Sequence, residues 1–117
     1  MKVINPADIE SKEVKDNPLF IGKVYAQFYF GPEVAKDLGM GLMTFAPGAR
    51  NVFHTHTTGQ ILYVTAGEGI VATEKEEVTL KPGMAVYIPA GEKHWHGATE
   101  KSSFSHLSIA PPHKTEF

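Results

Sequence analysis

Cysteine is absent from this chain of 117 residues. Its absence excludes disulfide bonds, iron–sulfur clusters, thiolate zinc sites and cysteine nucleophiles together. A metal ion bound here must therefore take its ligands from histidine, carboxylate or amide side chains. A chain without cysteine also suits a reducing compartment, and we expect a cytoplasmic protein.

Long apolar runs and an excess of positive charge are missing as well. The longest unbroken apolar run is Met84 to Ile88, far below the roughly 18 residues of a membrane span. Pro6 and Asp8 interrupt the N-terminal stretch before it reaches the length of a signal-peptide core, so we expect neither export nor membrane contact. With 11 Lys and Arg against 13 Asp and Glu, the net charge is −2. Because no basic run is present, we expect no nucleic-acid partner.

Helical periodicity is absent too, while turn residues recur at short intervals. The 11 Gly and 8 Pro gather in pairs such as Pro47-Gly48 and Pro82-Gly83, which favour turns. Between them lie short segments rich in β-branched and aromatic residues, at 21–30, 41–45, 51–56, 60–65, 69–73, 78–80, 84–88 and 104–109. This spacing predicts a single all-β domain, a sandwich or barrel of about eight to ten strands. Only Glu33 to Leu38 has room for a helical turn.

The chain divides into three expected parts: an N-terminal arm at 1–20, a barrel at 21–110 and a C-terminal tail at 111–117. The arm carries charge and little apolar content, so we expect it to dock on the body or on another subunit. The strand at 60–65 is apolar on both sides, and we expect both of its faces to be buried. The arm and the outward side chains Ile61, Tyr63 and Thr65 together predict a homodimer.

Five of the six histidines lie on expected strands or at their ends. His54 and His56 are two residues apart, so an extended backbone puts both rings on one face with Cα atoms about 6.6 Å apart. That spacing lets two imidazoles converge on one metal ion. The same spacing joins His94 and His96. From the residues alone, a solvated surface pair is the other interpretation of each motif.

These spacings resemble the two conserved motifs of the cupin superfamily. The first motif is matched by Gly48-x5-His54-x-His56-x3-Gln60-x6-Gly67, and the second by Gly83-x5-Pro89-x-Gly91-x2-His94. The resemblance implies a cupin jelly-roll barrel with one divalent metal ion per chain. Carried over by position, the metal ligands are His54, His56, Gln60 and His94.

Two positions depart from the usual motifs. Gln60 stands where glutamate is usual, and Ala98 stands where the second motif often ends in asparagine. Gln60, together with the run from Gly91 to Ala98, resembles the bacterial cupin hydroxynitrile lyases. This resemblance implies Mn²⁺, with Fe, Ni or Zn as alternatives, and the cleavage or formation of aromatic cyanohydrins. It also implies that His96 and His106 are the catalytic residues, with His106 as the base.

Glutamine and histidine at these positions have chemical consequences. A glutamine ligand offers a neutral carbonyl oxygen, so the ion keeps its full charge, acts as a stronger Lewis acid and is held less tightly. A histidine of ordinary pKa, about 6.5, can accept a hydroxyl proton at neutral pH. Two other functions stay open: dioxygenase-type chemistry at open coordination positions and non-catalytic binding of a small molecule. From the residues alone, His106 is a polar residue on a half-buried strand, and His113 is a solvated tail residue.

Overall fold

Antiparallel β-strands make up nearly all of the regular structure in the computed structural model, which describes residues 1–117. The one helical segment is the three-residue 3-10 turn η1 (Pro6–Asp8), and no helix is long and apolar enough to cross a membrane. The strands are β1 (Lys12–Glu13), β2 (Phe20–Ile21), β3 (Val24–Phe30), β4 (Gly39–Phe45), β5 (Arg50–Asn51), β6 (Thr55–His56), β7 (Gln60–Gly67), β8 (Gly69–Thr73), β9 (Glu77–Leu80), β10 (Ala85–Ile88), β11 (His94–Ala98), β12 (Phe104–Ala110) and β13 (Thr115–Glu116). The expected all-β single domain is confirmed.

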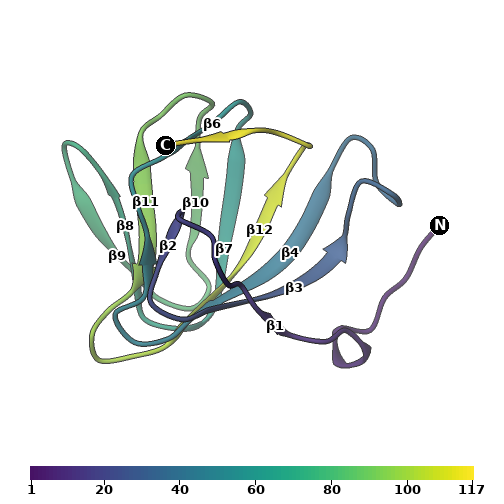
Figure 1. Ribbon diagram of the computed structural model, residues 1–117, viewed down its shortest axis with the longest axis horizontal. Helices are drawn as coiled ribbons and strands as arrows, with labels where there is room; N and C mark the ends of the chain where they lie inside the picture. Colours follow the sequence, from purple (N-terminus) through teal and green to yellow (C-terminus); the bar gives the residue numbers. More distant parts are fainter.

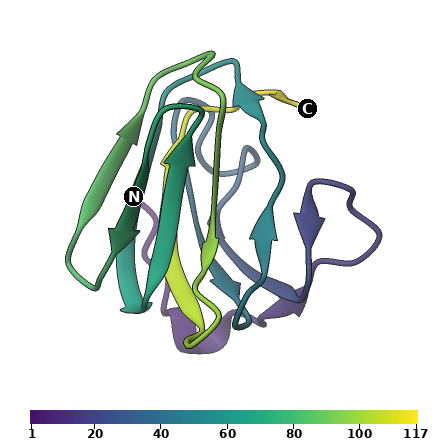
Figure 2. The same ribbon diagram turned by 90° about the vertical axis from the view of Figure 1, so that its left-hand side faces the viewer.

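Two sheets face each other and hold the core between them (Figure 1 and Figure 2). The larger sheet has the strand order β1-β3-β4-β12-β7-β10, and the smaller has the order β2-β5-β11-β8-β9. A third, two-stranded sheet joins β13 to β6. Strands distant in the sequence are thus neighbours in space, as when β12 pairs with both β4 and β7.

Apolar side chains that alternate along the strands fill the space between the sheets. Phe45 and Phe104 are fully buried, and their rings lie 6.1 Å apart. On β7, Leu62 and Val64 point into this core. The other face of β7 corrects the expectation that both faces are buried, because no element of this chain covers it. Ile61 and Tyr63 are each 43% exposed there.

The strand count exceeds the expected eight to ten because several paired segments are only two residues long. The expected strand at 51–56 is divided, since a bend at Phe53 separates β5 from β6. The segment Glu33 to Leu38 forms turns and no helix, with Val34 N and Ala35 N donating to Gly31 O. The N-terminal part of the chain pairs with the body at two places: β1 with β3, and β2 with β5.

The C-terminal tail crosses the open end of the two sheets, where β13 lies beside β6 (Figure 1). Thr115 pairs with His56 in this register, and Glu116 pairs with Thr55. Thr57 N donates to Lys114 O, which adds a further backbone hydrogen bond at the same place. The tail is therefore held against the strand that carries one of the candidate ligands.

Candidate metal centre

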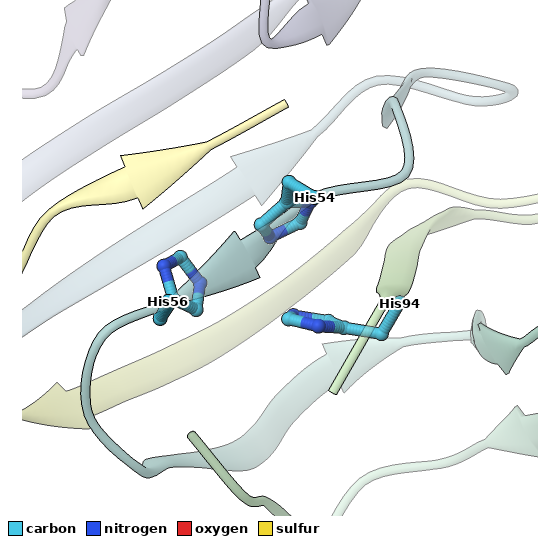
Figure 3. Close-up of side chains that lie close together, drawn as sticks. All are labelled: His54, His56 and His94. Carbon is cyan, nitrogen blue, oxygen red and sulfur yellow. The ribbon is translucent and has the colours of Figure 1, made fainter. Parts of the chain in front are cut away.

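Three candidate ligands, His54, His56 and His94, meet at the end of the sandwich next to β13, and Figure 3 shows their rings facing a common space. His54 and His94 form an isolated antiparallel bridge in which each backbone N–H donates to the other's carbonyl, at 2.9 and 3.0 Å. This bridge joins the two sequence motifs directly. His56 follows two residues after His54, on the same face. One ring nitrogen from each residue lies within 4.8 Å of the others.

The rings of His54 and His94 are oriented by backbone carbonyls. His54 Nδ1 lies 2.7 Å from Val52 O, and His94 Nδ1 lies 2.8 Å from Glu92 O. A carbonyl oxygen only accepts hydrogen bonds, so both Nδ1 atoms carry the proton. Each Nε2 therefore keeps its lone pair. That is the tautomer in which an imidazole binds a metal ion through Nε2.

His56 and Gln60 are oriented by side chains from distant strands. His56 Nδ1 lies 3.0 Å from Thr115 Oγ1 on β13. Gln60 Nε2 donates to Ser108 Oγ on β12 at 2.7 Å, and the Gln60 side chain lies close enough to the His56 ring to raise its pKa against the effect of burial. Gln60 is only 6% exposed. The structure therefore brings the glutamine of the first motif to the histidine group.

Several acceptor atoms in this group are buried without any partner. They are His56 Nε2, His94 Nε2 and Gln60 Oε1. Burying such polar atoms unpaired costs about 1–3 kcal/mol each. A divalent cation would satisfy all of them, because imidazole nitrogen and amide oxygen are both metal ligands. The residues present therefore fit a metal ion, and the group could hold one.

Burial also keeps these rings uncharged. Desolvation is the largest cause that lowers the pKa of His54 and of His56 from 6.5 to about 4. Neighbouring histidines contribute to both shifts. Desolvation likewise lowers the pKa of His94, against its hydrogen bond to the Glu92 carbonyl. At pH 7 all three rings are neutral, so no proton has to leave before a metal ion binds.

His96 and His106, the two expected catalytic residues, lie side by side next to this group. Their ring centroids are 4.8 Å apart, and the His96 ring lies 6.0 Å from that of His94. His96 is 4% exposed and His106 is fully buried, with the Phe45 ring 5.7 Å from each. Burial lowers the pKa of His106 to about 4 and that of His96 well below its usual 6.5. Both rings are therefore neutral at pH 7. The expectation of a histidine base with an ordinary pKa of about 6.5 is corrected, because burial disfavours the charged form of each ring.

Sequence reasoning missed three polar residues that contact the site. Asn51 is 2% exposed and binds His96, Ser108 binds Gln60, and Thr115 binds His56. Ser108 had a signal, since it shares a strand face with His106. The other two gave none, because their partners are more than 40 residues away in the chain. The ring of His113, expected to be solvated, is exposed but lies 4.6 Å from that of His56.

The family follows from residues 41–110, which match the model of the cupin domain, Cupin_2. The chain belongs to the cupin family. Its fold is thereby identified as the cupin jelly roll that the sequence motifs imply. Within this cupin, the matched segment contains every candidate ligand and both further site histidines.

This cupin is similar in sequence to a named enzyme and similar in fold to solved structures. It is 41% identical over 105 residues to the (R)-mandelonitrile lyase of Granulicella tundricola, covering 89% of this chain and 72% of that one. The crystal structure of a cupin-like protein from Thermotoga maritima superposes with a TM-score of 0.82 at 29% identity, covering 92% and 86% of the two chains. A polyketide cyclase from Streptomyces resistomycificus, at 21% identity and a TM-score of 0.84 over 100% of this chain and 86% of that one, shares the fold.

Proposed function

We propose that this cupin is a metal-dependent lyase that cleaves and forms aromatic cyanohydrins. The observation that carries the proposal is the 41% identity with a protein named (R)-mandelonitrile lyase, which extends over 89% of this chain. The buried acceptor atoms described above support the metal ion that the proposal needs. His96 and His106 support the proton transfer, since both are buried beside the candidate ligands.

We assign His54, His56, Gln60 and His94 as the ligands of one Mn²⁺ ion per chain. Because all four are neutral, the ion would keep its full charge. When bound, such an ion supplies a Lewis acid that lowers the pKa of the cyanohydrin hydroxyl. Fe, Ni and Zn also bind imidazole and amide ligands, so measurement of the metal content is part of the test.

A hollow of about 380 Å³ next to the ligands is the proposed substrate pocket. Its lining includes Phe28, Phe30, Met40, Met43, Ser108 and His113. Ser108 binds Gln60, and the ring of His113 lies 4.6 Å from that of His56, so two lining residues of the hollow contact metal ligands. Met43 is the strand partner of His106 across β4 and β12. Aromatic and thioether side chains suit the aryl group of an aromatic cyanohydrin.

His106 is the proposed base, and its hydrogen bonds fit that role. His106 Nδ1 lies 3.2 Å from Leu107 O, so Nδ1 carries the ring proton and Nε2 keeps its lone pair. Nε2 has no partner in the structure. This atom accepts the hydroxyl proton as the carbon–carbon bond to the nitrile breaks. The aldehyde forms, cyanide leaves with the electron pair, and the proton returns to it as HCN.

Release of benzaldehyde from mandelonitrile tests this function. We expect cleavage by the Mn²⁺-loaded protein and none above background by the metal-free protein. His106→Ala should keep its metal and lose about 10²–10⁴-fold in rate, which is the usual cost of removing a positioned base. Equal rates for the loaded and metal-free proteins would contradict a metal-dependent lyase. Full activity in His106→Ala would move the base to another residue.

A further inference from the structure

The side chain of Asn51 connects two atoms of His96. Asn51 lies on β5, next to β11, and is 2% exposed. Its Oδ1 accepts a hydrogen bond from the backbone N–H of His96 at 2.8 Å. Its Nδ2 lies 3.1 Å from His96 Nε2. One amide group thus contacts both the main chain and the ring of the same residue.

These two contacts settle where the proton of the His96 ring lies. A backbone N–H only donates, so the amide oxygen of Asn51 has to face it, and the amide NH₂ group is left facing the ring. An NH₂ group also only donates. His96 Nε2 is therefore the acceptor and carries no proton, which leaves the single proton of the neutral ring on Nδ1. The backbone contact thereby removes the usual ambiguity in amide orientation.

The two buried histidines then have opposite hydrogen-bonding groups free. His96 Nδ1 is buried without a partner and bears a proton to donate. His106 Nε2 is buried without a partner and bears a lone pair, because Leu107 O holds the proton on the other nitrogen. The rings lie edge to face, with centroids 4.8 Å apart. Neither nitrogen forms a hydrogen bond that stabilises the fold.

We propose that Asn51 is a positioning residue that fixes His96 as a hydrogen-bond donor to the substrate. The inference rests on the proposed lyase function. In cyanohydrin cleavage, the oxygen and the nitrile group both gain negative charge, and an N–H aimed at either one stabilises the transition state. His96 would then be unable to serve as the base, and that role would fall to His106 alone.

A nitrogen NMR spectrum of isotope-labelled, metal-free protein tests the assignment, since it separates protonated from unprotonated ring nitrogens. In the wild-type protein we expect the His96 proton on Nδ1. Asn51→Asp offers two acceptor oxygens in the same shape, so one still binds the backbone N–H while the other requires a proton on Nε2. We therefore expect the proton to move to Nε2 in this variant.

The same variant has an expected kinetic effect in the Mn²⁺-loaded protein. With the donor lost, kcat for mandelonitrile should fall by about 10–100-fold, as is usual when a residue that orients a site group is changed, while KM stays nearly constant. Asn17→Asp is the matched control, because Asn17 is exposed and uses only its Oδ1, as acceptor from Leu19 N. This control adds the same charge and should change neither the His96 spectrum nor kcat.

Each outcome has a clear meaning. A proton on His96 Nε2 in the wild-type protein would overturn the inference, and so would an unprotonated Nε2 or an unchanged kcat in Asn51→Asp. If Asn51→Asp does not fold, the wild-type spectrum alone decides. A wild-type protein with the proton on Nδ1 but no lyase activity would overturn the proposed function and still support the assignment of the His96 proton.

Discussion

Burial of His106 decides when this side chain carries a proton. The ring is fully buried, and desolvation lowers its pKa from 6.5 to about 4. In the unfolded chain the pKa returns to about 6.5. Between these two values the unfolded chain binds more protons than the folded one, so the free energy of unfolding decreases as the pH falls from 6.5 towards 4.

Acid should therefore destabilise the metal-free protein, and His106→Gln should reduce that effect. For one group with this shift, the loss between about pH 7 and pH 5 is about 2 kcal/mol. Urea unfolding of the metal-free wild-type protein at both pH values, repeated with His106→Gln, measures the contribution. We expect the variant to lose about 2 kcal/mol less than the wild-type protein. An identical loss in the two proteins would show that the His106 ring is protonated normally in the fold.

At the residue scale, the sequence predicted the parts of the site that lie close together in the chain. His54 and His56 share a strand face because of their spacing alone. Gln60 and His94 were expected as their partners through the cupin resemblance, and the structure brings both to the same place. The role of Asn51 was not predicted, because its neighbours in the sequence do not indicate a contact with a ring 45 residues further along the chain.

At the element scale, β13 brings the C-terminal tail into contact with the site. Its Thr115 hydroxyl is the only polar group seen at His56 Nδ1, at 3.0 Å. Two hydrogen bonds hold the strand in place. Thr57 N donates to Lys114 O, and Lys114 N donates to Thr57 Oγ1. The tail therefore sets the orientation of one candidate ligand ring from outside the matched cupin segment.

Thr115→Val should weaken metal binding while it leaves the strand intact, because valine keeps the shape and removes the hydroxyl. Loss of a partner that orients a ligand typically costs about 10–100-fold in metal affinity. Calorimetric titration with Mn²⁺ measures the change. Thr65→Val is the matched control, since Thr65 Oγ1 binds Ser105 O on the exposed side of β7. Equal affinity in Thr115→Val and the wild-type protein would show that β13 has no part in the metal centre.

The sequence pattern predicted the long strands and missed the short ones for a physical reason. Turn residues and β-branched segments mark a strand such as β7 or β12, because local conformational preference and burial act within one segment. The pairing of β2 with β5, or of β13 with β6, depends on backbone hydrogen bonds to a distant partner. Two residues carry too little pattern to reveal such a pairing.

At the scale of the whole molecule, the outer face of the larger sheet exposes apolar side chains on β7 and β10. Ile61 and Tyr63 on β7 are each 43% exposed, and Tyr87 on β10 is 67% exposed. The register pairs Tyr87 with Ile61 and Leu107 with Tyr63, so these side chains share one face. An exposed apolar patch of this kind is typical of a protein interface. We propose that a second copy of this chain covers it.

The homodimer should therefore depend on Tyr63. Sedimentation at micromolar concentration should give a dimer for the wild-type protein and a monomer for Tyr63→Lys, since a charge on that face would be desolvated in the interface. Val78→Lys, which changes an exposed apolar residue on the smaller sheet, is the control and should stay dimeric. A wild-type monomer, or a Tyr63→Lys dimer, would contradict this interface.

The most direct test of a metal-dependent lyase is the rate of benzaldehyde release from mandelonitrile as Mn²⁺ is added stepwise to metal-free protein. One ion bound by His54, His56, Gln60 and His94 predicts that the rate rises in proportion to the Mn²⁺ bound. It also predicts that the rise stops at one ion per chain and that His54→Ala shows no rise. A rate that is independent of Mn²⁺, or a full rise in His54→Ala, would contradict the metal centre and the chemistry assigned to it.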